Sequence, residues 1–206
     1  IQLFFYSPFL GGKLVNKTKK LRLKMTDRLE KFRKIHFDVL HSHHNLTSVL
    51  LRYYFAKTPL LSFIHGRLDF LDKPPFFIKS NYYGGISQET CNQLKKHNIN
   101  KNKIFYFPNS VNVERFKPKN KLPIWPKKLL VISNSIRKKA AKVVKQTAKG
   151  LNLSVKFVGK NKQKFNIEKE IQQTDIVMSL GRGIIEAMSC AKAALAFSYD
   201  DLHKYG

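Results

Sequence analysis

One stretch decides the fold: Asp175-Ile176-Val177-Met178-Ser179-Leu180-Gly181-Arg182-Gly183-Ile184-Ile185-Glu186-Ala187-Met188. Residues 176–180 are largely apolar and predict a short strand that is buried on both faces. A Gly-Arg-Gly turn follows, and residues 184–191 predict a helix that contains Glu186. Glycine lets a ligand approach bare backbone, and the unpaired N–H groups at a helix start suit phosphate. The pattern predicts a nucleotide-binding edge of an α/β sheet, although many such turns carry glycine for steric reasons alone.

Strands and helices are expected to alternate along the rest of the chain. The expected strands span residues 1–6, 37–42, 59–64, 82–87, 103–107, 129–133, 153–157 and 193–197. The expected helices span residues 13–34, 45–57, 136–149 and 167–174, with one more that begins near Ser87. Residues 67–79 contain Pro74-Pro75 and predict a loop. This alternation predicts an α/β protein with parallel sheets.

A proline-containing stretch divides the chain. Residues 117–128 hold Pro118, Pro123 and Pro126 and show no periodic pattern, so we place a domain boundary there. The expected architecture is two Rossmann-like domains whose parallel sheets face a cleft (a GT-B arrangement), the first over residues 1–120 and the second over 121–206. Both domains are expected to be incomplete, because the sequence does not begin with Met and stops without a closing element.

Composition and charge limit the classes of function. No window approaches 18 apolar residues, so we expect no membrane-spanning helix. Two distant cysteines, Cys91 and Cys190, are typical of a reduced compartment such as the cytoplasm. The formal net charge of +26 favours polyanionic partners. A biased composition produces the same charge without any binding role, so a nucleic-acid binder is the least favoured function.

Basic residues are densest between Lys13 and Lys34. The apolar positions of this stretch recur at helical spacing and leave a basic outer face; they are Leu14, Leu21, Met25, Leu29 and Phe32. Such a helix fits an anionic membrane surface. We therefore expect a cytoplasmic protein whose first domain rests peripherally on the inner face of the membrane.

Polar clusters fall at the carboxyl ends of the predicted strands, where α/β sheets bind ligands. The clusters are His41 with His43 and His44, His65-Gly66, Asn109, residues 133–139 and residues 181–183. The neighbouring histidines suggest a metal, but no cysteine or carboxylate cluster accompanies them. We therefore predict no metal site.

Five motifs in order resemble those of GT-B glycosyltransferases in family four, the retaining nucleotide-sugar enzymes. They are Phe37-Asp-Val-Leu-His-Ser-His-His44, His65-Gly66, Ile86-Ser87, Pro108-Asn109-Ser-Val-Asn112 with Phe116 and Pro118, and Gly181-Arg-Gly-Ile-Ile-Glu-Ala-Met-Ser-Cys190. The resemblance covers roughly residues 37 to 200. It implies transfer of a sugar from a nucleotide-diphosphate sugar to a glycan or lipid-linked acceptor, with no cofactor beyond the donor itself.

The resemblance also implies roles for particular residues. Glu186 corresponds to the acid that holds the ribose hydroxyls, which suits a carboxylate because it accepts hydrogen bonds from two adjacent hydroxyls. The remaining donor-binding positions are Gly181, Arg182, Gly183, Lys139 and Arg137. His65 is the implied catalytic residue near the transferred sugar. The implied acceptor-side positions are His43, His44, Gly66 and Asn109.

Several positions depart from the family pattern. The family often has a second Glu eight positions before Glu186, and Met178 stands there. The family's Arg after the first strand of the second domain corresponds to Asn134, and two of its glycines correspond to Ser110 and Ala191. Loss of the second Glu removes a contact to the donor sugar. A catalytically degenerate protein that binds a nucleotide or polymer is therefore the alternative function.

Overall fold

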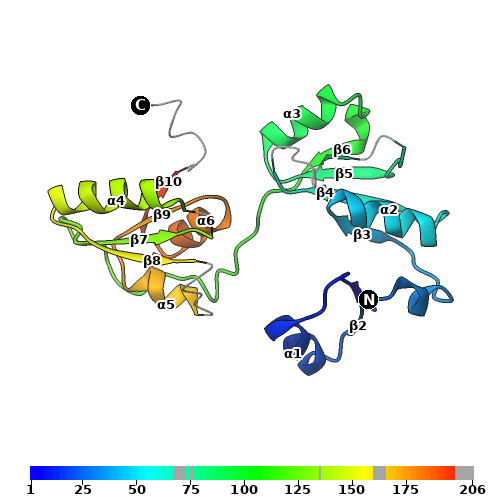
Figure 1. Ribbon diagram of the computed structural model, residues 1–206, viewed down its shortest axis with the longest axis horizontal. Helices are drawn as coiled ribbons and strands as arrows, with labels where there is room; N and C mark the ends of the chain where they lie inside the picture. The colour runs from blue at the N-terminus through cyan, green and yellow to red at the C-terminus, as the bar shows by residue number, and fades with distance from the viewer. Residues whose placement is uncertain (67–72, 75–76, 135, 160–165, 198–206) are drawn as a thin grey trace. The chain divides into compact units, whose positions relative to one another are not determined.

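The computed structural model describes residues 1–66, 73–74, 77–134, 136–159 and 166–197. The chain divides into two compact units, residues 1–108 and 109–206, which are described separately (Figure 1). Each unit carries a four-stranded parallel sheet with helices between its strands. The predicted α/β class with parallel sheets is confirmed. No helix in the described ranges is long and apolar enough to cross a membrane.

The sheet of the first unit has the strand order β3-β4-β5-β6. Its elements are β3 (Leu40–His43), α2 (Asn45–Tyr54), β4 (Leu60–Ile64), β5 (Tyr82–Gly85), α3 (Gln88–Lys96), η2 (Lys101–Lys103) and β6 (Ile104–Tyr106). Helix α3 begins where predicted, because the Ser87 hydroxyl accepts a hydrogen bond from the Thr90 N–H at 3.1 Å. The predicted loop at residues 67–79 lies mostly outside the described residues.

The amino-terminal segment differs from its prediction. The expected helix over residues 13–34 is instead α1 (Gly12–Lys20), β2 (Lys24–Thr26) and the 3₁₀ turn η1 (Leu29–Phe32), and β2 pairs in parallel with β1 (Phe4–Tyr6). Arg22 ends the helix at φ +53°, and the Leu23 N–H donates to the Thr18 carbonyl at 3.0 Å. The apolar spacing belongs to three separate elements, so the extended basic helix predicted to rest on a membrane does not form.

The second unit has the strand order β10-β9-β7-β8. Its elements are β7 (Lys128–Ile132), α4 (Lys138–Gly150), β8 (Ser154–Val158), α5 (Ile167–Gln172), β9 (Ile176–Ser179), α6 (Arg182–Ser189) and β10 (Ala193–Ala196). Leu130 and Val177 pack with Ala187 of α6 in one core cluster, while Val131 packs with Val144 of α4 in another. The sheet is therefore buried on both faces, with α4 on the face away from α5 in Figure 1.

The division between the units lies at residues 108/109, earlier than the boundary that the sequence predicts at 120/121. Phe116 explains the difference, because its ring is buried in the core of the second unit and its carbonyl accepts a hydrogen bond from the Ser189 hydroxyl. Arg115 also forms an ion pair with Glu168 of α5 at 2.6 Å. Residues 109–120 therefore pack with the second unit although they precede its first strand.

Candidate functional site

The strand order of the second unit places a topological switch point between β7 and β9. The chain leaves β7 for β8 on one side and then returns to place β9 on the other side of β7. At such a switch point the two following helices diverge, and the carboxyl ends of the strands leave room for a ligand. The helices that start there are α4 and α6, so the predicted donor-binding residues of both loops lie at adjacent strand ends.

Two glycines shape the turn between β9 and α6. Gly181 has φ +64° and ψ −126°, a conformation that favours glycine. Gly183 is buried in the first turn of α6, and a Cβ added there would lie 2.3 Å from Ser179 Oγ. Gly183 is therefore required for close packing of helix on strand, whatever ligand binds. The first N–H groups of a helix lack intrahelical acceptors and suit phosphate, but the Ile184 N–H already donates to the Gly181 carbonyl at 3.2 Å.

Glu186 lies in α6, one turn after Arg182. Its carboxylate Oε1 is 3.4 Å from Arg182 Nη2, and its side chain is only 14% exposed, whereas that of Arg182 is 65% exposed. Burial raises the pKa of Glu186, and the positive charges of Arg182 and Arg115 partly offset that rise. A half-buried carboxylate beside two guanidinium groups can accept hydrogen bonds from hydroxyls or hold a cation.

The cations predicted for the donor phosphates lie at the start of α4. Arg137 is the N-cap residue of this helix and Lys139 is in its first turn, and both side chains are exposed. They follow β7, whose neighbour β9 leads into the Gly181 turn. The structure thus brings Arg137 and Lys139 to the strand end next to that of Gly181, Arg182, Gly183 and Glu186.

Sequence reasoning missed Arg115 and Gly159. Arg115 contributes positive charge near Glu186 through its place beside Glu168, a contact between residues far apart in sequence that no local pattern reveals. Gly159 follows β8, and a Cβ added there would lie 1.7 Å from the carbonyl oxygen of Ser133. The two strand-end loops therefore touch through bare backbone. A lone glycine directly after a predicted strand was the available signal for this contact.

The structure also shows where the positions that depart from the family pattern lie. Met178 lies within β9 and packs among the core residues around Leu129 and Val131. Only Leu180 and Gly181 separate β9 from α6, and neither of them is an acid. Asn134 is exposed directly after the end of β7.

In the first unit three predicted histidines come together at the ends of β3 and β4. Nδ1 of His43 is 2.5 Å from Nε2 of His65, and the two rings stack with centroids 4.7 Å apart. The ring of His44 lies 6.3 Å from that of His65. Burial, together with the smaller effect of the neighbouring histidines, lowers the pKa of His43 to about 4, so this imidazole is neutral at pH 7.

His44 has an unusual backbone conformation. It is the N-cap residue of α2, and its φ of +76° with ψ of +152° falls in a region that is essentially restricted to glycine. Gly66 follows His65 directly, so it lies beside this cluster. Asn109 is the first residue of the second unit, and the turn that follows it is held by Asn112, whose side chain accepts from the Arg115 N–H at 2.9 Å.

Buried hydroxyls lie beneath the histidines. Ser42 of β3 is 2.8 Å from Ser48 of α2 and 2.9 Å from Ser62 of β4, and Ser48 and Ser62 are 3.0 Å apart, measured between their Oγ atoms. Ser62 also reaches Ser80 at 2.6 Å. This serine network, residues 42, 48, 62 and 80, ties β3, β4 and α2 together below the site.

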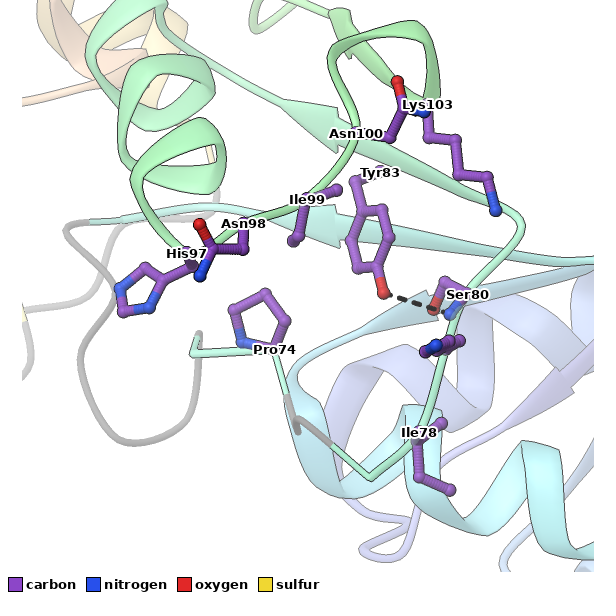
Figure 2. Close-up of a pocket in the computed structure, with 10 residues that line it drawn as sticks. Pro74, Ile78, Ser80, Tyr83, His97, Asn98, Ile99, Asn100 and Lys103 are labelled. Carbon is purple, nitrogen blue, oxygen red and sulfur yellow. Dashed lines mark hydrogen bonds between the residues drawn. The ribbon is translucent and has the colours of Figure 1, made fainter.

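A separate cavity of about 300 Å³ lies at the opposite end of the same sheet (Figure 2). In it, the hydroxyl of Tyr83 accepts a hydrogen bond from the backbone N–H of Ser80 at 3.0 Å. Tyr83 stands near the amino end of β5, and Lys103 precedes β6. Because parallel α/β sheets bind their ligands at the carboxyl ends of the strands, we place neither donor nor acceptor in this cavity.

Histidine, cysteine and carboxylate side chains do not form a metal-binding group of three or more within the ranges that the structure describes. The four histidines at positions 41, 43, 44 and 65 are instead connected by ring stacking and by the His43–His65 hydrogen bond. The chemistry that the cluster offers is hydrogen bonding, with His43 as a neutral imidazole.

Solved structures share this architecture. Anabaena HepE, crystallised in complex with UDP, matches with a TM-score of 0.64 at 14% identity, over 91% of this chain and 71% of HepE. HepE in complex with UDP-glucose gives a TM-score of 0.63 at 13% identity, over 90% and 70% of the two chains. The fold is that of a GT-B-like glycosyltransferase.

A glycosyltransferase from Rickettsia africae has the same fold, with a TM-score of 0.60 at 16% identity over 93% of this chain and 71% of that protein. No family model matches the chain, and no curated protein matches it. At such low identities the likeness to this GT-B-like fold concerns architecture, and the chemistry has to be argued from the residues themselves.

Proposed function

We propose that the chain is a glycosyltransferase that moves a sugar from a nucleotide-diphosphate sugar to a glycan or lipid-linked acceptor with retention of configuration. One observation carries the proposal: Glu186 is half-buried one turn into α6, at the switch point of the second sheet, in a fold whose relative HepE binds UDP and UDP-glucose. The resemblance to family four and the retention of configuration rest on the sequence motifs alone.

Glu186 is proposed to accept hydrogen bonds from the two ribose hydroxyls of the donor, a task that requires its ionised form. The N–H groups around Gly181 and Gly183 face the diphosphate. Arg182, Arg137 and Lys139 supply positive charge at the same strand ends, where negative charge grows on the departing diphosphate as the sugar leaves. The chain's own cations therefore provide the charge stabilisation that the reaction needs.

His65 is proposed to orient the transferred sugar from the first unit. Its Nε2 is engaged with His43, and this contact fixes the orientation of the His65 ring. His44, Gly66 and Asn109 would contribute to the acceptor side. We place the protein in the cytoplasm, which fits the two buried, free thiols of Cys91 and Cys190.

The alternative is a transferase-like protein that binds a nucleotide or polymer without turnover. It is favoured by Met178, which packs in the core of the sheet at the position where the family pattern often has a second Glu. Turnover distinguishes the two functions, because both include nucleotide binding.

The test is a calorimetric titration of the protein with UDP, GDP and their glucose conjugates. We expect one nucleotide to bind, Glu186→Gln to abolish that binding, and the matched control Glu170→Gln, whose side chain pairs with Lys156, to bind normally. Unchanged affinity in Glu186→Gln would remove Glu186 from the site. Release of free nucleotide or transfer of the sugar would then establish catalysis, whereas binding without either would establish the alternative.

A further inference from the structure

An exposed apolar tip precedes β7 in the second unit. Residues 122–125 are Leu122, Pro123, Ile124 and Trp125, and the exposed fractions of the three larger apolar side chains are 45%, 90% and 80%. Scattered single apolar residues are common on surfaces, but three within four positions form a contiguous patch. We call residues 117–128 the Trp125 segment.

Lysines flank the tip on both sides. They are Lys117, Lys119, Lys121, Lys127 and Lys128, all exposed, and the Trp125 segment contains no acidic residue. An apolar centre with an indole ring and a ring of ammonium groups has the chemistry of the membrane interface, where Trp lies at the headgroup level and Lys contacts anionic lipid. Binding strength there scales with the buried apolar area plus the attraction to anionic headgroups.

The backbone of the tip suits the same environment. Pro123 and Pro126 have no N–H, so fewer backbone donors lose water when the tip enters the headgroup region. The two ends of the segment are fixed to the second unit. Gln172 donates to the Lys117 carbonyl at 3.4 Å, and Asp175 Oδ2 accepts from the N–H groups of Lys127 and Lys128 at 2.8 and 3.0 Å.

The location leaves the donor crevice open. The Trp125 segment leads into the amino end of β7, and the crevice is at the carboxyl end of that strand. Leu151, which is 64% exposed, precedes β8 at the same amino-terminal edge, where the Ser154 N–H bonds to the Lys127 carbonyl at 2.8 Å. A flat surface that contacts this edge would therefore not cover Gly181 or Glu186.

We propose that the Trp125 segment docks the protein on an anionic lipid bilayer, with Leu122, Ile124 and Trp125 in the interface and the lysines on the headgroups. This replaces the basic helix predicted over residues 13–34 as the membrane contact. A single-stranded nucleic acid also stacks on Trp and contacts lysine, but it has no need of the two exposed aliphatic side chains beside the indole. The proposal is independent of glycosyl transfer.

Trp125 is the one tryptophan of the chain, so its fluorescence reports on this segment alone. Unlabelled protein is mixed with vesicles of phosphatidylcholine, with and without phosphatidylglycerol. We expect a shift of the emission to shorter wavelength that requires phosphatidylglycerol, and quenching by brominated acyl chains. Sedimentation with the vesicles measures the binding in parallel.

Pairs of matched variants distinguish binding through the Trp125 segment from binding through the general positive charge or exposed apolar surface of the protein. Leu122→Ser with Ile124→Ser should weaken sedimentation with anionic vesicles more than about tenfold, whereas Val143→Ser with Leu195→Ser, which changes exposed aliphatic residues elsewhere, should not. Lys119→Gln with Lys121→Gln should weaken it about fivefold per lysine, compared with little change for Lys142→Gln with Lys149→Gln.

Four outcomes would overturn the proposal. They are absence of binding to anionic vesicles, binding that the segment variants leave intact, an emission shift caused by a random single-stranded oligonucleotide but not by vesicles, and a shift that follows protein concentration without vesicles. The last two would assign the segment to nucleic acid and to a second copy of the chain, respectively.

Discussion

Nδ1 of His43 lies 2.5 Å from Nε2 of His65, and this contact joins the carboxyl ends of β3 and β4. Only one of the two nitrogens carries the proton, so each imidazole determines which nitrogen of the other is a donor. If His65 orients the transferred sugar, His43 is its positioning residue. Stacking of His43 between His41 and His65 fixes the ring further.

Replacing His65 with Ala should lower kcat by about 10²-fold or more, because the sugar loses an oriented hydrogen-bonding partner. His43→Ala should lower kcat about tenfold with little change in KM, and His43→Asn should restore part of it, since an amide can mimic the Nδ1 contact. The measurement is nucleotide release from the donor that titration identifies. His97→Ala, at the exposed end of α3, is the control. Equal kcat in all variants would exclude the pair from the reaction.

His44→Gly should raise the free energy of unfolding by about 1–3 kcal/mol, because glycine adopts φ +76° and ψ +152° without strain. His44→Ala keeps the strained backbone and removes the ring, so it should not gain stability. If the imidazole serves the acceptor side, both variants lose activity to the same extent. Urea denaturation followed by circular dichroism provides the comparison, and a stability loss in His44→Gly would contradict it.

Donor binding and the stability of the free protein should depend on pH in opposite directions at Glu186. Burial raises the folded-state pKa of this carboxyl above its unfolded value, so its contribution to stability is present below the unfolded pKa and is lost as pH rises through the folded pKa. Ribose binding requires the ionised form, so nucleotide affinity should fall as pH decreases through the same range. Glu186→Gln should raise Tm at neutral pH and remove both dependences. Calorimetry and thermal denaturation over a pH series measure them.

Gly183→Ala should destabilise the second unit by about 1–3 kcal/mol, because the new methyl group would lie 2.3 Å from Ser179 Oγ and 2.9 Å from Ser179 Cβ. Adding Ser179→Ala should recover part of the loss by removing the hydroxyl. Gly150→Ala, where a Cβ meets nothing within 4 Å at the end of α4, should be neutral or stabilising. Similar Tm values for Gly183→Ala and Gly150→Ala would refute the steric role.

The stretch from Asp175 to Met188 was predictable because strand, turn and helix each leave a local pattern. A continuous apolar run marks β9, and Gly181 marks the positive φ that the turn requires. The segment from Lys13 to Lys34 was not predictable, because its apolar spacing fits one helix as well as the three elements that form. Only the tertiary packing of Leu29 and Phe32 decides between these alternatives.

The sites divide in the same way. Residue types at strand ends predict which side chains gather, as His43, His44 and His65 do. Arg115 was missed because its contact with Glu168 joins distant parts of the sequence. The approach of Gly159 to Ser133 was missed because the glycine was its one local signal, and a glycine does not indicate which loop it contacts. The place of Met178 inside β9 was predictable, because the apolar run over residues 176–180 already indicates a strand there.

The four hydroxyls of residues 42, 48, 62 and 80 lie inside the first unit, where each satisfies another and none reaches bulk water. An apolar replacement at any one of them leaves the neighbouring hydroxyls without a hydrogen-bond partner in a place that water does not reach. Their identities are therefore interdependent. Substitutions at these four positions are therefore tolerated only when they occur together, and the alignment of β3 with β4 beneath the histidines depends on the same four residues.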